Sequence, residues 1–229
     1  MRRVLEPELL DSLPPDDPAA IRSRADLRRV NWWMRNEAHI FKAIRALPKP
    51  PSSILEIGAG DGTFMLRLAR RLHRMNPHPV ELYLLDKDPV VSTRTTADFR
   101  ELGWSAEVVR ENVLRWSDQR DRTHVDLIVA NLFLHHFAEN DLRSLFHGVA
   151  HACDAFVACE PRRWRASLIG SRLLWLIGCN HVTRHDAVVS VRAGFNGNEL
   201  TKLWPNKAGF HIVEGAAGFA SHLFVASRA

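Results

Sequence analysis

From Ser53 onward the sequence alternates short apolar runs with longer stretches of mixed polarity. Runs such as Asp126–Ala130 and Ala155–Cys159 are almost wholly apolar, so neither face of such a strand is suited to water. Strands of this kind are typical of a parallel sheet that crossover helices cover on both faces. This alternation predicts an α/β fold.

The pattern predicts seven strands separated mostly by helices. The strands are expected at Ile54–Ile57, Glu81–Leu85, Ala106–Val109, Asp126–Ala130, Ala155–Cys159, Phe210–Glu214 and His222–Ala226. The helices are expected at Thr63–Arg74, Val90–Leu102, Asp141–Ala150 and Asn198–Leu203. The short connection Gly215–Ser221 favours an antiparallel hairpin for the last two strands.

Two parts of the chain depart from this alternation. Residues 1–50 lack a strand pattern, and a helix capped by Asp17 or Ser23 is expected to continue to Ile44 before the prolines at 48–51 end it. Residues 161–195 interrupt the alternation with a long, irregular stretch. We therefore expect a helical N-terminal extension over residues 1–50 and one catalytic-type domain over residues 51–229, with an insertion at 161–195.

Length and composition narrow the class of protein. The chain has 229 residues, of which 46% are hydrophobic, enough for a full core, and its net charge of +5 is too small to favour a nucleic-acid partner. No apolar stretch approaches the roughly 20 residues that cross a bilayer, so we expect neither a secretion signal nor stable membrane insertion. Three cysteines without metal spacing predict reduced, buried thiols and a cytoplasmic protein. Composition does not indicate an oligomeric state.

A glycine-rich turn follows the first predicted strand. Glycines occur at every second position, Gly58, Gly60 and Gly62, where the strand gives way to a helix. Glycine lets the backbone approach a ligand without a Cβ in the way, and ligands bind at this edge of an α/β sheet. Thr63 stands where the dinucleotide fingerprint needs glycine or alanine, and no Gly-Lys-Ser/Thr of a phosphate loop follows. The turn therefore predicts a nucleotide site of another kind.

The segment Glu56-Ile57-Gly58-x-Gly60-x-Gly62 resembles the first motif of class I S-adenosylmethionine-dependent methyltransferases. The resemblance extends along residues 52–160 and the two final strands, and it implies a Rossmann-like fold with a mostly parallel seven-stranded sheet. It also implies S-adenosyl-L-methionine as cofactor, with Asp86 at the end of the second strand on the ribose hydroxyls. The implied cofactor-binding residues are Glu56, Gly58, Ala59, Gly60, Gly62, Asp86, Lys87, Asn112, Val113 and Asn131.

One of these positions departs from the family pattern. Asn112 follows the third strand, where the family often has an aspartate that accepts from the adenine amino group. An asparagine carbonyl can accept the same hydrogen bond without charge assistance. A plain turn residue is an equally good interpretation.

The fourth strand is followed by Asn131-Leu132-Phe133-Leu134-His135-His136. This segment resembles the ubiquinone- and menaquinone-biosynthesis type of methyltransferase and its small-molecule relatives. It lacks the proline pair of enzymes that methylate base amines, so a nucleic-acid methyltransferase is a minor alternative. His135 and His136 are the candidate catalytic residues, as general base or positioning group, and a purely structural role is open for each. His181 and His185 are second choices, and no cluster with the spacing of a metal site is evident.

The insertion is the expected place for the methyl acceptor. Trp164–Cys179 is a mostly apolar helix candidate that either roofs an apolar substrate or covers core, and Trp32 and Trp33 either close over the site or pack. We expect methyl transfer to a small apolar or aromatic molecule, of the kind met in secondary metabolism. A phenolic or enolic oxygen is the first choice of acceptor atom and a carbon the second. The alternative from another class is a cofactor-binding regulatory module without turnover.

Overall fold

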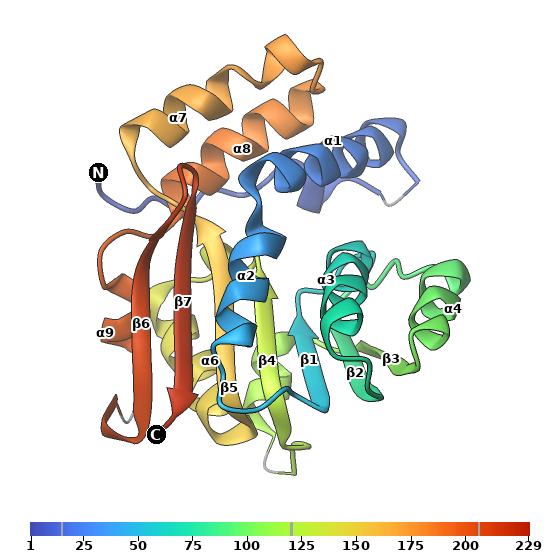
Figure 1. Ribbon diagram of the computed structural model, residues 1–229. Coiled ribbons are helices and arrows are strands. Elements are labelled where there is room, and N and C mark those ends of the chain that lie inside the picture. The colour runs from blue at the N-terminus through green and yellow to red at the C-terminus, as the bar shows by residue number, and fades with distance from the viewer. Residues whose placement is uncertain (15, 120, 206) are drawn as a thin grey trace.

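The computed structural model describes residues 1–14, 16–119, 121–205 and 207–229, and all of their side chains except Asn31 and Trp32. A seven-stranded sheet runs through its centre in the order β3-β2-β1-β4-β5-β7-β6 (Figure 1). The first five strands are parallel, and β7 pairs antiparallel with both β5 and β6, so the expected sheet and its closing hairpin are confirmed. The strands are β1 (Ser53–Ile57), β2 (Val80–Asp86), β3 (Trp104–Arg110), β4 (Val125–Asn131), β5 (Cys153–Pro161), β6 (Phe210–Ala217) and β7 (Ser221–Arg228).

The register of the central strands brings three predicted segments to one edge of the sheet. Ile57 at the end of β1 lies opposite Leu85 of β2 on one side and Ala130 of β4 on the other. The glycine turn, Asp86 and Asn131 directly follow or end these strands. They therefore meet at the carboxyl edge, where α/β proteins bind their ligands.

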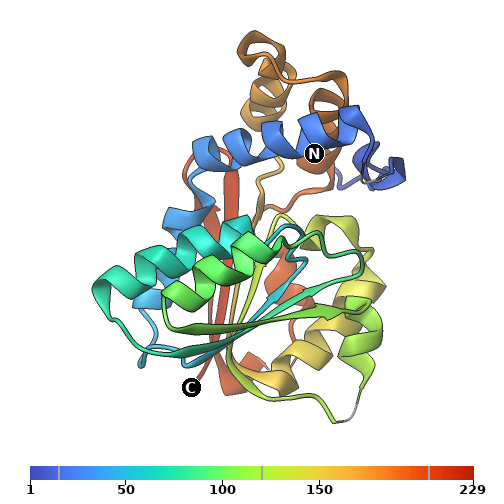
Figure 2. The ribbon, with the colours of Figure 1, turned by 90° about the vertical axis from the view of Figure 1, so that its right-hand side faces the viewer.

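Helices cover both faces of the sheet, as the apolar strands require (Figures 1 and 2). One core cluster joins strand residues to α2 (Asn36–Arg45), α3 (Thr63–Met75) and α4 (Thr93–Glu101). The second joins them to α5 (Val113–Asp118), α6 (Glu139–Ala152) and α9 (Glu199–Leu203). A short 3-10 helix, η4 (Lys207–Gly209), leads into β6. Among the described residues, no helix combines the length and apolar character that a membrane crossing requires.

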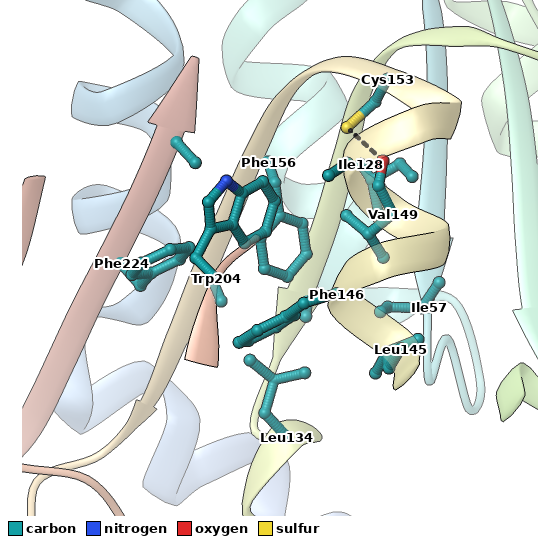
Figure 3. Close-up of a cluster of buried hydrophobic side chains, with 14 of the residues drawn as sticks. Ile57, Ile128, Leu134, Leu145, Phe146, Val149, Cys153, Phe156, Trp204 and Phe224 are labelled. Atoms are coloured by element: carbon teal, nitrogen blue, oxygen red, sulfur yellow. Dashed lines mark hydrogen bonds between the residues drawn. The ribbon is translucent and has the colours of Figure 1, made fainter. Parts of the chain in front are cut away.

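Stacked aromatic rings hold the antiparallel edge against the rest of the sheet. Trp204 stacks on Phe156 of β5 with ring centroids 5.6 Å apart, and Phe146 of α6 stacks on Phe224 of β7 at 5.9 Å (Figure 3). All four rings are buried, and stacking of this kind adds about 0.5–1.5 kcal/mol per pair beyond the area that it buries. These rings fix the hairpin β6–β7 beside β5.

The N-terminal extension consists of two helices where the sequence predicts one. α1 (Pro18–Met34) and α2 meet at Arg35, whose backbone is left-handed with φ 56°. Because of this break, α1 leaves the sheet and packs against the insertion, whereas α2 lies on β5 and α3. The sequence offers no glycine or proline at the break, which is why one continuous helix is the natural expectation.

The stretch 161–195 is mostly helical and not irregular, and the single helix candidate at Trp164–Cys179 is divided into two shorter helices. The stretch folds into α7 (Arg165–Arg172), the 3-10 helix η3 (Leu174–Ile177) and α8 (His181–Ala193). Asn180 begins α8 as its cap, since its side chain accepts a hydrogen bond from the Thr183 amide. The β-branched residues of α8 obscure its helical pattern. α1, α7 and α8 form a layer beyond the carboxyl ends of β4 and β5 (Figures 1 and 2).

Candidate functional site

The glycine turn connects β1 to α3 and leaves open space above one of its residues. The amides of Gly58 and Ala59 donate to the carbonyl of Leu85, and the amide of Gly60 donates to Asp86 Oδ2 at 2.9 Å. Gly60 has φ +54°, and a Cβ placed there would meet no heavy atom within 4 Å. The turn is therefore held by the next strand, and at Gly60 it leaves open space into which a ligand can come close to the backbone.

A buried carboxyl group beside the turn has one oxygen without a partner in the described part of the chain. Glu56 is only 2% exposed, and its Oε2 has no hydrogen-bond partner among the described residues. Burial, and then the charges of Asp61 and Asp86, raise the pKa of Glu56 well above its ordinary value. A buried polar atom left unpaired is costly, so this geometry favours a ligand that brings a hydrogen-bond donor.

The remaining residues that the cofactor motif implies lie around the turn. Asp86 accepts the Gly60 amide at one oxygen and the Asp88 amide at the other. Asn112 caps α5 through Oδ1, which accepts from the Leu114 amide at 2.9 Å. Gly62 begins α3, where a Cβ would approach Thr95 to 3.3 Å. Lys87 is exposed beside Asp86, and Val113 is buried in the core.

One cavity of about 1700 Å³ joins the glycine turn to the loop after β4. Of the predicted site residues, those in the described part of its wall are Glu56, Gly58, Ala59, Gly60, Asn131, His135 and His136. Gly62, Asp86, Lys87, Asn112 and Val113 lie outside that described wall. Its apolar roof comes from the insertion and α1, and includes Leu27, Met34, Leu173, Leu174, Leu176 and Ile177.

Trp32 and Trp33 of α1 are the candidates for closing over the site. Trp33 lines the cavity and is 68% exposed, so it is not buried by packing. The side chain of Trp32 lies outside what the structure describes.

A buried carboxylate from the neighbouring strand holds the loop after β4. Glu160 of β5 is completely buried and accepts the backbone amides of Phe133 and Leu134 at 3.0 and 2.9 Å. It also lies 2.8 Å from Nδ1 of His135, which belongs to the 3-10 helix η2 (Leu134–His136). The sequence shows the signal for this role, an acid at the end of an apolar strand, as at Glu56 and Asp86.

The other ring nitrogen of His135 faces a residue of the N-terminal extension. Its Nε2 lies 3.4 Å from Oε1 of Glu8, which also accepts the hydroxyl of Ser190. Burial alone would lower the pKa of His135, but hydrogen bonds to Glu160 and Glu8 outweigh that effect and raise the pKa to about 9. His135 is therefore a protonated ring between two carboxylates at neutral pH, which makes it unsuited to act as a general base there.

His136 has the opposite character. Its ring lies 4.3 Å from that of His135, and its Nδ1 is 3.8 Å from Asp11 of the 3-10 helix η1 (Leu10–Ser12). Burial, and then the charge on His135, lower the pKa of His136. Its side chain keeps 30% of its surface accessible and lines the cavity. A neutral imidazole in such a place can accept a proton.

Glu8, His135 and His136 also have the residue types of a metal site, since one ligand atom from each lies within 4.8 Å of the others. Both ring nitrogens of His135 already face carboxylates, which a protonated ring satisfies without a cation. We therefore interpret this cluster as a proton-holding group. Sequence reasoning missed Glu8, because nothing near it in the sequence marks it as functional.

The two histidines that are second choices for the catalytic role lie away from the cavity. His181 and His185 are exposed in the first part of α8, and neither belongs to the described cavity wall. Nδ1 of His185 is 3.0 Å from Asp186, whose carboxylate accepts the amides of Leu9 and Leu10. This part of α8 anchors the N-terminal segment.

Comparison with known proteins agrees with this geometry. A family model described as a methyltransferase domain matches residues 55–155, whereas no curated protein matches the chain significantly in sequence. The plantazolicin methyltransferase BamL, solved with a triazolic desmethylPZN analog and SAH, has a TM-score of 0.66 at 16% identity, with 95% of this chain and 92% of that chain covered.

Two further solved structures share the fold. An O-methyltransferase family protein from Burkholderia thailandensis has a TM-score of 0.56 at 15% identity, with coverage of 95% and 64%. The pyocyanin biosynthetic protein PhzM has a TM-score of 0.58 at 18% identity, with coverage of 93% and 60%. At such identities these likenesses concern the fold.

Proposed function

We propose that this chain is a class I methyltransferase that transfers the methyl group of S-adenosylmethionine to a hydroxyl oxygen of a small apolar acceptor. A phenolic or enolic oxygen suits the site best, because the cavity joins an apolar roof to a neutral histidine. A carbon acceptor is the second choice. The observation that carries the proposal is the single cavity whose wall contains both the glycine turn and His136.

Residues of the turn fit the cofactor. Glu56 offers an unpaired buried oxygen, and the space above Gly60 admits a ligand. The Asp86 carboxylate keeps lone pairs for two ribose hydroxyls beside the backbone amides that it already accepts. Asn131 would lie near the amino-acid end, and Lys87, Asn112 and Val113 near the nucleoside end. When bound, the cofactor supplies a methyl group on a sulfonium, which is already a strong electrophile.

The protein's task on the acceptor side is to orient the hydroxyl, exclude water and remove a proton. Leu173 and Leu174 of the roof provide an apolar surface for the body of the acceptor. His136 takes the hydroxyl proton as the oxygen becomes a nucleophile, and His135 and Glu160 hold the loop that carries His136. Alignment of this kind supplies much of the rate enhancement in a transfer between two bound groups.

The first test measures turnover. Incubation of the protein with a cell extract and methyl-labelled S-adenosylmethionine should yield a labelled apolar product. His136→Ala should lower the rate of its formation by about 10²–10⁴, with partial recovery toward pH 9 as the acceptor hydroxyl ionises by itself. His147→Ala, at an exposed position of α6, is the matched control. Cofactor binding without any labelled product would instead favour a regulatory module.

The second test measures the cofactor site alone. Asp86→Ala removes charged hydrogen bonds worth about 1.5–3 kcal/mol each, so calorimetry should show binding weakened at least tenfold. Asp88→Ala, two residues further and 68% exposed in its side chain, should leave affinity near that of the wild type. Equal affinity in a folded Asp86→Ala variant would rule out its ribose contact.

A further inference from the structure

We propose that Glu8 is a positioning residue of the methyl-transfer site, whose carboxylate holds His135 and stabilises the positive charge that arrives on His136 with the acceptor proton. The inference rests on the proposed function and adds a residue from the N-terminal extension to it. Glu8 acts through the two histidines and needs no contact with the acceptor.

The N-terminal segment is fixed over the histidine loop by bonds at both of its ends. We call residues 3–12 the N-terminal strap; it runs beside α8 before α1 begins (Figure 1). The guanidinium of Arg3 donates to the carbonyls of His135, Phe137 and Ala193. At the other end, the amides of Leu9 and Leu10 donate to Asp186 of α8 at 2.8 and 3.0 Å. Glu8 therefore reaches the site from a tethered backbone.

The side chain of Glu8 is also held in place. Its Oε1 accepts the hydroxyl of Ser190 on α8 and lies 3.4 Å from Nε2 of His135. One of its oxygens lies within 4.8 Å of a ring nitrogen of His136. The side chain of Glu8 is 12% exposed, so water screens its charge only weakly. Its charge therefore acts on both histidines.

Carboxylates around His136 oppose the burial and the His135 charge that lower its pKa. His136 is faced by Glu8 and Asp11 from the strap, by Glu160 from β5 and by His135 on its own loop. Arg3 binds the carbonyls of this loop from the strap side. Three carboxylates and two positive groups, the His135 ring and the Arg3 guanidinium, leave an excess of negative charge beside His136. Removal of Glu8 would take away part of that excess and the partner of His135 Nε2.

In the transfer step, two bonds break and two form. The acceptor O–H bond breaks, and its proton goes to His136. An oxygen lone pair forms the bond to the methyl carbon, while the electron pair of the carbon–sulfur bond stays on sulfur. His136 later returns the proton to water, and Glu8 keeps its charge throughout.

The test compares Glu8→Gln with Glu6→Gln. Glutamine keeps the shape and the acceptor oxygen of Glu8 but removes its charge, whereas Glu6 is an exposed strap residue paired with Arg192 at 3.3 Å. With extract and methyl-labelled cofactor at pH 7, Glu8→Gln should form the labelled product about tenfold more slowly or worse. The deficit should shrink toward pH 9, and Glu6→Gln should match the wild type. A deficit that is constant with pH, or no deficit, would overturn the inference.

Two further measurements keep the outcomes separate. Histidine NMR titration should show a lower pKa for His135 in Glu8→Gln, because Glu8 raises that pKa, and an unchanged pKa would contradict the contact. If Glu8→Gln does not fold, Ser190→Ala should give a smaller deficit with the same pH dependence. Normal turnover in His136→Ala would refute the proposed base, whereas impaired His136→Ala beside normal Glu8→Gln would refute only the role of Glu8.

Discussion

Asn36 of α2 donates a hydrogen bond from Nδ2 to Oδ1 of Asn131 at the end of β4, at 2.9 Å. Asn36 is completely buried, and its own Oδ1 accepts the hydroxyl of Ser221 of β7. The first residue of α2 is thus bonded to two strands of the sheet. One of those bonds orients a side chain in the cavity wall.

Asn36→Ala should therefore affect both stability and the cofactor site. It removes the hydrogen bonds that Asn36 makes with the buried Ser221 hydroxyl and the half-buried Asn131 amide, which we expect to cost about 1–3 kcal/mol in the free energy of unfolding. A less ordered Asn131 should also weaken binding of the demethylated cofactor severalfold. Urea denaturation and calorimetry measure the two effects, with Asn140→Ala at an exposed position of α6 as control. A variant that loses stability but binds with unchanged affinity would limit Asn36 to a structural role.

The sequence predicts those parts of the site that arise from local pattern. Glu56, Gly60 and Asp86 stand where an apolar strand ends, and parallel strands bring such ends together. Glu8 has no such signal, because its partner His135 comes from a distant segment that only the tertiary fold places beside it. The break at Arg35 is equally invisible, since it depends on where α1 finds packing against α8.

The glycine turn offers a test with an internal control. Gly60→Val should abolish cofactor binding, because a branched side chain would enter the open space above the turn and strain a backbone with φ +54°. Gly103→Val introduces the same kind of strain at φ +73°, also with no heavy atom within 4 Å, in the turn between α4 and β3. Both variants should lose some stability, but only Gly60→Val should lose binding by calorimetry. Similar loss of binding in both would mean that strain alone is responsible.

Two neighbouring apolar residues of the insertion differ in whether they line the cavity. Leu173 lines the cavity, whereas Trp175 is 57% exposed and does not belong to the described cavity wall. Leu173→Ala should therefore change the preference among apolar acceptors, by about 1–3 kcal/mol of discrimination for a lost pocket contact. Trp175→Ala should not, and neither should change cofactor affinity. Competition between labelled acceptors measures the ratio, and an unaltered ratio in Leu173→Ala would place the acceptor elsewhere.

Because His135 is charged in the folded protein at neutral pH, we expect its contribution to the free energy of unfolding to depend on pH. Its pKa in the folded protein is about 9, above the ordinary 6.5, so its contribution is complete below about pH 6.5 and is lost as the pH rises through 9. The difference in unfolding free energy between wild type and His135→Gln should fall over this window, by up to roughly 3 kcal/mol. His211→Gln, at an exposed position of β6, should show no such change. Urea denaturation at half-unit steps of pH measures the difference. A value that stays constant from pH 6.5 to 9 would show that His135 is neutral in the folded protein, and the general-base role would then be open to His135 as well as to His136.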